Sequence, residues 1–114
     1  MTRFRIKKTG KGMYQYVFRF KIRFRPSVFR GNEHTTIAAC IDEINEVKDT
    51  INNGSCLAYI KSKLGWQFTL FSLVKEPIGF SRTFFTQKLM KRMLAIVQQH
   101  AASAEIILPG EKPA

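Results

Sequence analysis

Apolar and charged residues alternate along the first part of the chain, which predicts β-strands with one buried face. The first alternating segment covers residues 3–8, and the second covers residues 14–25. Because successive side chains of a strand point to opposite faces, one face of each segment is apolar and the other is cationic. Residues 9–12 would form the turn between the segments, and Pro26 would end the regular ladder.

Apolar residues then recur every three to four positions, which predicts an amphipathic helix over residues 33–51. Asn32 is placed to cap this helix, and Glu33 lies in its first turn. Cys40 falls on the apolar stripe, so we expect a buried thiol there and no disulfide with Cys56. The acidic residues that we expect off the stripe are Asp42, Glu43, Glu46 and Asp49.

The second half of the chain repeats this order of elements, which predicts an internal duplication. Residues 15–18 match residues 67–70, and Phe29 matches Phe84. The expected elements are strands at 56–62, 66–73 and from 78, a helix at 87–102 capped by Thr86, and a final strand at 105–108. The boundaries that follow are 3–54 for repeat one, 55–108 for repeat two and 109–114 for a flexible tail, all within one domain of residues 1–114.

The second repeat resembles one repeat of the YegP-like proteins, which are small, mostly bacterial and largely of unknown function. The residues that carry the resemblance are Gln67–Leu70, Ile78–Ser81, Phe84 or Phe85 before the helix, and Ala104–Ile106. The resemblance implies an α+β fold in which two strand-strand-strand-helix-strand repeats form one antiparallel sheet. Two helices would pack on one face, and the units would exchange C-terminal strands as a pseudo-dimer within one chain. The resemblance implies no chemistry.

The first repeat departs from this pattern where its second and third strands would meet. Gln15 and Phe29 are 14 positions apart, whereas Gln67 and Phe84 are 17 positions apart. Residues 14–30 would therefore form either a very tight hairpin or one long strand. The same segment contains the densest positive charge of the chain.

The chain has a net charge of +11, and its charged residues are distributed unevenly along the sequence. Residues 1–32 contain ten Lys or Arg and no Asp or Glu, whereas residues 33–53 contain five acids and one Lys. A field this positive raises the local concentration of anionic partners.

The cations of the two alternating segments lie mainly at odd-numbered positions, and Arg30 follows them in the sequence. The candidate binding residues are Arg3, Arg5, Lys7, Arg19, Lys21, Arg23, Arg25 and Arg30. One interpretation is a solvated outer face of a sheet. The other is an anion-binding face, most simply for nucleic-acid phosphates, because adjacent like charges are destabilising without a counter-charge. Phe18, Phe20 and Phe24 share the opposite parity, so we expect them in the core and expect phosphate contacts rather than base readout.

No group of residues predicts catalysis or a metal site. His34 and His100 are far apart in sequence, and the two cysteines lack histidines at ligand spacing. We therefore expect no catalytic residue, no metal and no cofactor. No apolar stretch approaches the length of about 18 residues that spans a membrane, and no secretory signal is recognisable, so we expect a cytoplasmic protein without membrane association.

The sequence as a whole predicts a non-enzymatic binding module, monomeric or dimeric, that binds DNA or RNA weakly through a basic sheet face. The alternative is a protein–protein interaction module, which docks an acidic protein or adds a strand at a sheet edge.

Overall fold

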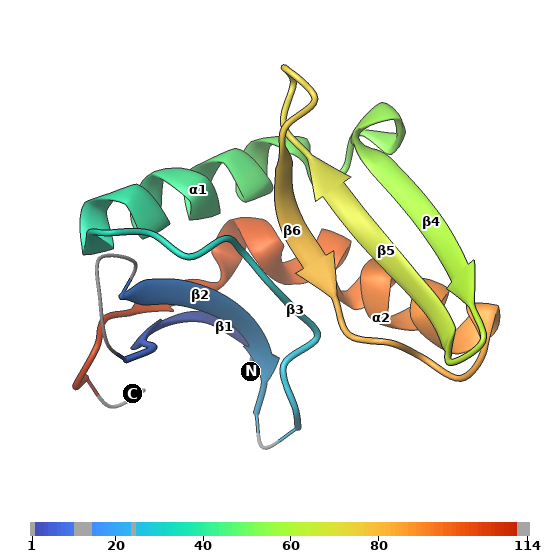
Figure 1. The fold of residues 1–114 in the computed structure, drawn as a ribbon, viewed down its shortest axis with the longest axis horizontal. Coiled ribbons are helices and arrows are strands. Elements are labelled where there is room, and N and C mark those ends of the chain that lie inside the picture. Colours follow the sequence, from blue (N-terminus) through green and yellow to red (C-terminus); the bar gives the residue numbers. More distant parts are fainter. Residues whose placement is uncertain (1, 11–14, 24, 112–114) are drawn as a thin grey trace.

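The computed structural model describes residues 2–10, 15–23 and 25–111. In this part of the chain seven strands and two α-helices follow one another (Figure 1). Their bounds are β1 Thr2–Lys8, β2 Tyr16–Ile22, β3 Phe29–Arg30, α1 Ile37–Thr50, β4 Leu57–Ser62, β5 Gly65–Phe71, β6 Pro77–Ser81, α2 Gln87–His100 and β7 Glu105–Ile107. Short 3-10 turns follow the helices at Gly54–Cys56 and Ala101–Ser103. The predicted α+β class is confirmed.

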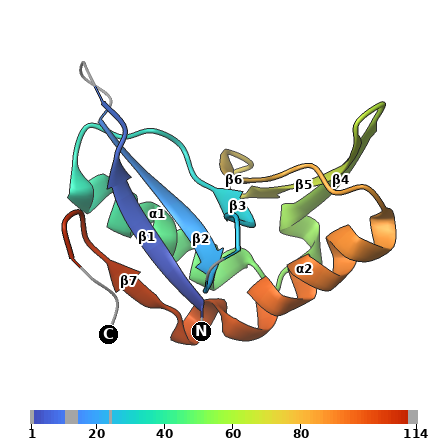
Figure 2. The same cartoon turned by 90° about the horizontal axis from the view of Figure 1, so that it is seen from below.

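All seven strands belong to one sheet, in the order β4-β5-β6-β3-β2-β1-β7. Neighbouring strands are antiparallel except β1 and β7, which are parallel, so the sheet is mostly rather than wholly antiparallel. The last strand of the chain therefore lies beside the first. Helix α1 contacts β2 and β6, and α2 contacts β5, so that both helices lie on one side of the curved sheet (Figure 2).

The two halves have matching local geometry. Isolated bridges join Tyr16 to His34 and Trp66 to Phe84, and each helix is capped by a threonine, Thr36 or Thr86. These counterparts lie 50 positions apart, whereas the predicted match of residues 15–18 with residues 67–70 implies a separation of 52 positions. The predicted match is therefore displaced by two positions from the structural correspondence, which is the same at the bridges and at the helix caps. The duplication itself stays a prediction.

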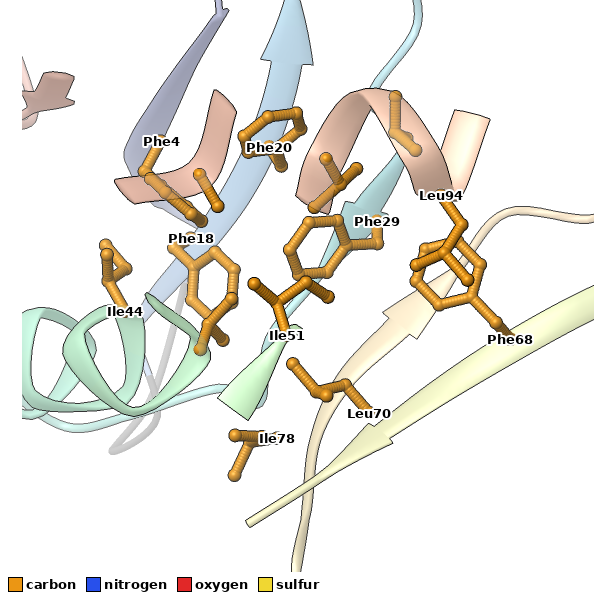
Figure 3. Close-up of a cluster of buried hydrophobic side chains, with 14 of the residues drawn as sticks. Phe4, Phe18, Phe20, Phe29, Ile44, Ile51, Phe68, Leu70, Ile78 and Leu94 are labelled. Atoms are coloured by element: carbon orange, nitrogen blue, oxygen red, sulfur yellow. The ribbon is translucent and has the colours of Figure 1, made fainter. Parts of the chain in front are cut away.

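A cluster of phenylalanine rings fills the core between the sheet and the helices (Figure 3). Phe4, Phe18, Phe20 and Phe29 are almost inaccessible, and their ring centroids lie 5.0–6.3 Å apart, mostly edge to face. Phe68 joins the cluster through Phe29 at 6.0 Å. The apolar parity predicted from the alternation therefore forms the core face, and the rings of Phe18 and Phe20 are unavailable to a ligand.

Two predicted element boundaries are wrong. Helix α1 begins at Ile37 after the cap Thr36, not after Asn32. Strand β2 ends at Ile22, because Arg23 adopts a φ of 44° and the Arg25 N–H donates to the Ile22 carbonyl at 3.0 Å. The segment is therefore a hairpin rather than one long strand. Several expectations fall outside the described residues: the turn at 11–12, Tyr14, Phe24 and the tail at 112–114.

Candidate anion-binding face

The face of the sheet opposite the helices carries six of the eight predicted cations. We call this set the basic face: Arg3, Arg5 and Lys7 of β1, Arg19 and Lys21 of β2, and Arg30 of β3. Strand register places them side by side. Arg5 pairs with Arg19, Arg19 pairs with Arg30, and Arg3 pairs with Lys21. Three like-charge pairs therefore lie directly opposite one another, each of which is destabilising in a sheet.

The basic face has little internal compensation. Within the described ranges no carboxylate lies within 4.0 Å of any of its six cationic groups. The Nε of Arg3 is inaccessible and has no hydrogen-bond partner among the described residues. Burial, and after it the charges of the neighbouring cations on β1 and β2, lowers the pKa of Lys21 below its ordinary value of 10.5. Each observation indicates that positive charge on this face destabilises the folded state.

The acids of helix α1 lie away from this face, whereas one acid of β7 lies beside it. Helix α1 covers the other side of the sheet, so its exposed Asp42, Glu46 and Asp49 cannot neutralise the basic face. The acid of β7 is Glu105, which is in register with Arg3. It was missed because it lies near the other end of the sequence, and only the β1–β7 pairing brings the two together. Even so, the two side chains form no ion pair.

Arg23 and Arg25 do not lie on the basic face, although their sequence parity suggested it. Both follow the end of β2, in the turn that leads to β3. Arg23 touches the basic face through its main chain, because the Arg3 Nη2 donates to the Arg23 carbonyl at 3.4 Å. Arg25 is exposed and lines a cavity at the end of the sheet. The alternation predicted strand β2 correctly but did not show where this strand ends.

The surroundings of the basic face suit an anion. Beside Arg30 the row continues with Phe80 of β6, whose ring centroid lies 5.2 Å from the Arg30 guanidinium carbon. Beside β1, a hollow of about 210 Å³ is lined by Arg5, Lys7 and Gly110, among others. The face therefore combines one exposed and five half-buried cations, a neighbouring aromatic ring and a shallow depression.

Other chemistry is poorly represented in the described part of the chain. It contains no group of three or more His, Cys, Asp or Glu placed to hold a metal ion. None of its helices is both long and apolar enough to cross a membrane. Cys40 and Cys56 are free and buried, and burial, with a smaller contribution from Glu43, raises the pKa of the Cys40 thiol to about 11. A thiol of this kind is unreactive near neutral pH.

Comparison with known proteins identifies the fold. No family model and no curated protein sequence matches the chain. A solution structure of a UPF0339 protein from Shewanella oneidensis superposes with a TM-score of 0.83 at 15% identity, over 94% of this chain and 90% of that one. The E. coli protein yegP, described as of unknown function, superposes with a TM-score of 0.81 at 17% identity, over 97% and 96% of the chains. The resemblance to YegP-like proteins is thus confirmed at the level of the fold, and neither structure names an activity.

Proposed function

We propose that this protein is a non-enzymatic module that binds nucleic acid weakly, by holding phosphates on the basic face. The observation that carries the proposal is the register of Arg5, Arg19 and Arg30, which form a row across three neighbouring strands and have no carboxylate partner among the described residues. A bound polyanion would supply the counter-charge that the described residues do not.

The dimensions of the row support this proposal. Neighbouring strands lie about 4.8 Å apart, so the row extends over about 10 Å. One strand of DNA presents a phosphate roughly every 3.4 Å of helix rise, so about three phosphates fall within that length. Contacts of this kind carry no sequence information, which predicts binding with little sequence preference.

The experiment is fluorescence anisotropy of labelled single- and double-stranded oligonucleotides at several salt concentrations. We expect dissociation constants in the range of about 1–100 μM, and a slope of log K against log salt of about −4 to −5 on duplex DNA. The test variant is Arg5/Arg19/Arg30→Gln. Because three phosphate contacts are lost, we expect weaker binding and a slope less negative by about 2 to 3.

A matched control removes the same charge elsewhere. Lys63/Lys91/Arg92→Gln removes three exposed cations from the β4–β5 turn and from α2. We expect this variant to keep a slope close to that of the wild type. Equal losses in the two variants would show that net charge alone drives binding, and no binding at about 50 mM salt would exclude the nucleic-acid function.

A second candidate function is favoured by one observation at the opposite end of the sheet. Strand β4 forms an edge, and its Tyr59 and Ile60 are each 48% exposed. An open edge with exposed apolar residues suits the addition of a partner strand. A partner captured by the wild type and by the Arg5/Arg19/Arg30→Gln variant, but not by Tyr59/Ile60→Lys, would favour this function over nucleic-acid binding.

A further inference from the structure

A cavity of about 230 Å³ opens where the β2–β3 turn meets the start of α2. Its floor is apolar and is made of the buried Val28, Phe84 and Met93. The cavity belongs neither to the basic face nor to the open edge at β4. Its volume and lining are suited to a small planar ring.

An unusually exposed aromatic residue stands at the rim of this cavity. Phe85 is 91% exposed, although the preceding Phe84 is buried. Phe85 directly precedes the helix cap Thr86, where an apolar residue often packs onto the first turn of the helix. Its exposure shows that it makes little such contact. The ring therefore contributes little to folding and is free to contact a ligand.

Two arginines flank the cavity. Arg82 is held in place, because its N–H donates to the Val28 carbonyl at 3.0 Å and its guanidinium lies 5.8 Å from the centroid of the Phe84 ring. Arg25 lines the cavity from the β2–β3 turn. Neither guanidinium has a carboxylate within 4.0 Å in the part of the chain that the structure describes. An occupant with an apolar ring next to a negative charge would match both features.

The cavity is connected to the basic face through the turn that contains Arg25. On one side of this turn, the Arg23 carbonyl accepts a hydrogen bond from the Arg3 guanidinium of the basic face. Two positions later, Arg25 lines the cavity. The turn therefore places Arg25 and the cavity two positions from a residue that the basic face contacts.

From this juxtaposition we propose that the cavity takes one base of a single-stranded nucleic acid. The base packs against Phe85, and an adjacent phosphate lies between Arg25 and Arg82. The proposal rests on the function proposed above and adds a preference to it. In a duplex the bases are stacked on one another and cannot enter the cavity, whereas an unpaired base can stack on an exposed aromatic ring.

The test compares a labelled strand of about 12 nucleotides, alone and annealed to its complement, at one salt concentration. We expect Phe85→Ala to weaken binding of the single strand by roughly tenfold and to leave binding of the duplex within about twofold. Phe85→Trp should retain the single-strand affinity, because a planar ring is kept. Leu73→Ala is the control, since Leu73 is 73% exposed in the β5–β6 turn, away from the cavity.

The outcomes separate this inference from the proposed function. If Phe85→Ala binds both oligonucleotides as the wild type does, the cavity has no role and the inference is overturned, while binding through the basic face stands. If the wild type binds neither oligonucleotide at about 50 mM salt, the proposed function is overturned and this inference with it. Equal loss for single strand and duplex in Phe85→Ala would also overturn the inference, because the preference depends on an unpaired base.

Discussion

At the scale of single residues, Glu43 has the environment that the sequence predicts least well. We expected it off the apolar stripe of α1, but it is 6% exposed. Its carboxylate accepts hydrogen bonds from the main-chain and side-chain nitrogens of Asn32, both at 2.9 Å, and the Nε2 of His34 lies 3.1 Å away. Gly31 lies so close to Glu43 that a Cβ there would collide with its carboxylate and with the Phe18 ring. Glu43 therefore organises the loop before α1.

We expect Glu43→Ala to lower the free energy of unfolding by about 2–3 kcal/mol, because the half-buried N–H and side-chain amide of Asn32 lose their acceptor. Urea denaturation measures the difference. Glu46→Ala serves as the control, because Glu46 is exposed on the same helix and should change stability by less than about 0.5 kcal/mol. Equal effects from the two substitutions would contradict the structural role given to Glu43.

At the scale of elements, the starts of the two helices were predicted with different success. Thr86 was correctly predicted as the cap of α2, whereas the cap of α1 is Thr36 and not the predicted Asn32. Asn32 is a good capping residue, but its side chain is used in the tertiary structure, where it donates to Glu43 and to the Pro77 carbonyl at 2.7 Å. A local preference was thus overridden by contacts with distant residues.

The two caps provide a paired test. The Thr36 and Thr86 hydroxyl oxygens accept from the N–H of Ala39 at 3.1 Å and of Leu89 at 3.0 Å. We expect Thr36→Ala and Thr86→Ala each to cost about 1 kcal/mol, with serine at either position restoring most of it. Thermal or urea unfolding gives the values. Thr35→Ala, just before the first cap, should be nearly neutral, and a loss there as large as at Thr36 would refute the assigned cap.

At the scale of the whole molecule, the uneven distribution of charge should affect stability as well as binding. The three like-charge pairs of the basic face lie among an excess of eleven positive charges. Each pair of opposed like charges costs up to about 1 kcal/mol in a sheet. Dissolved salt weakens such repulsion, since the Debye length falls from about 10 Å at 0.1 M to about 3 Å at 1 M.

We therefore expect added sodium chloride to stabilise the wild type by about 1 kcal/mol between low and high salt. The Arg5/Arg19/Arg30→Gln variant should gain less, because two of its three like-charge pairs are absent. Urea midpoints at matched salt concentrations make the comparison, with Lys63/Lys91/Arg92→Gln as the charge-matched control. The same salt response in all three proteins would show that the basic face carries no special repulsion.

The sequence by itself determined the features that depend on local periodicity. Alternation with a period of two separated Phe18 and Phe20 from Arg19 and Lys21, and the structure places these pairs on opposite faces. Helical spacing located α1 and α2, and the class of fold followed from the order of elements. These features were predictable because each is decided by how neighbouring side chains alternate along one strand or helix.

The tertiary structure alone decided what depends on contacts between distant residues. It paired β1 with β7, buried Glu43, and placed Arg25 with Arg82 beside Phe85. None of these could be read from periodicity, because the partners are separated by many positions. Register between strands is set by the packing of the whole core, and register is what brings Arg5, Arg19 and Arg30 into one row.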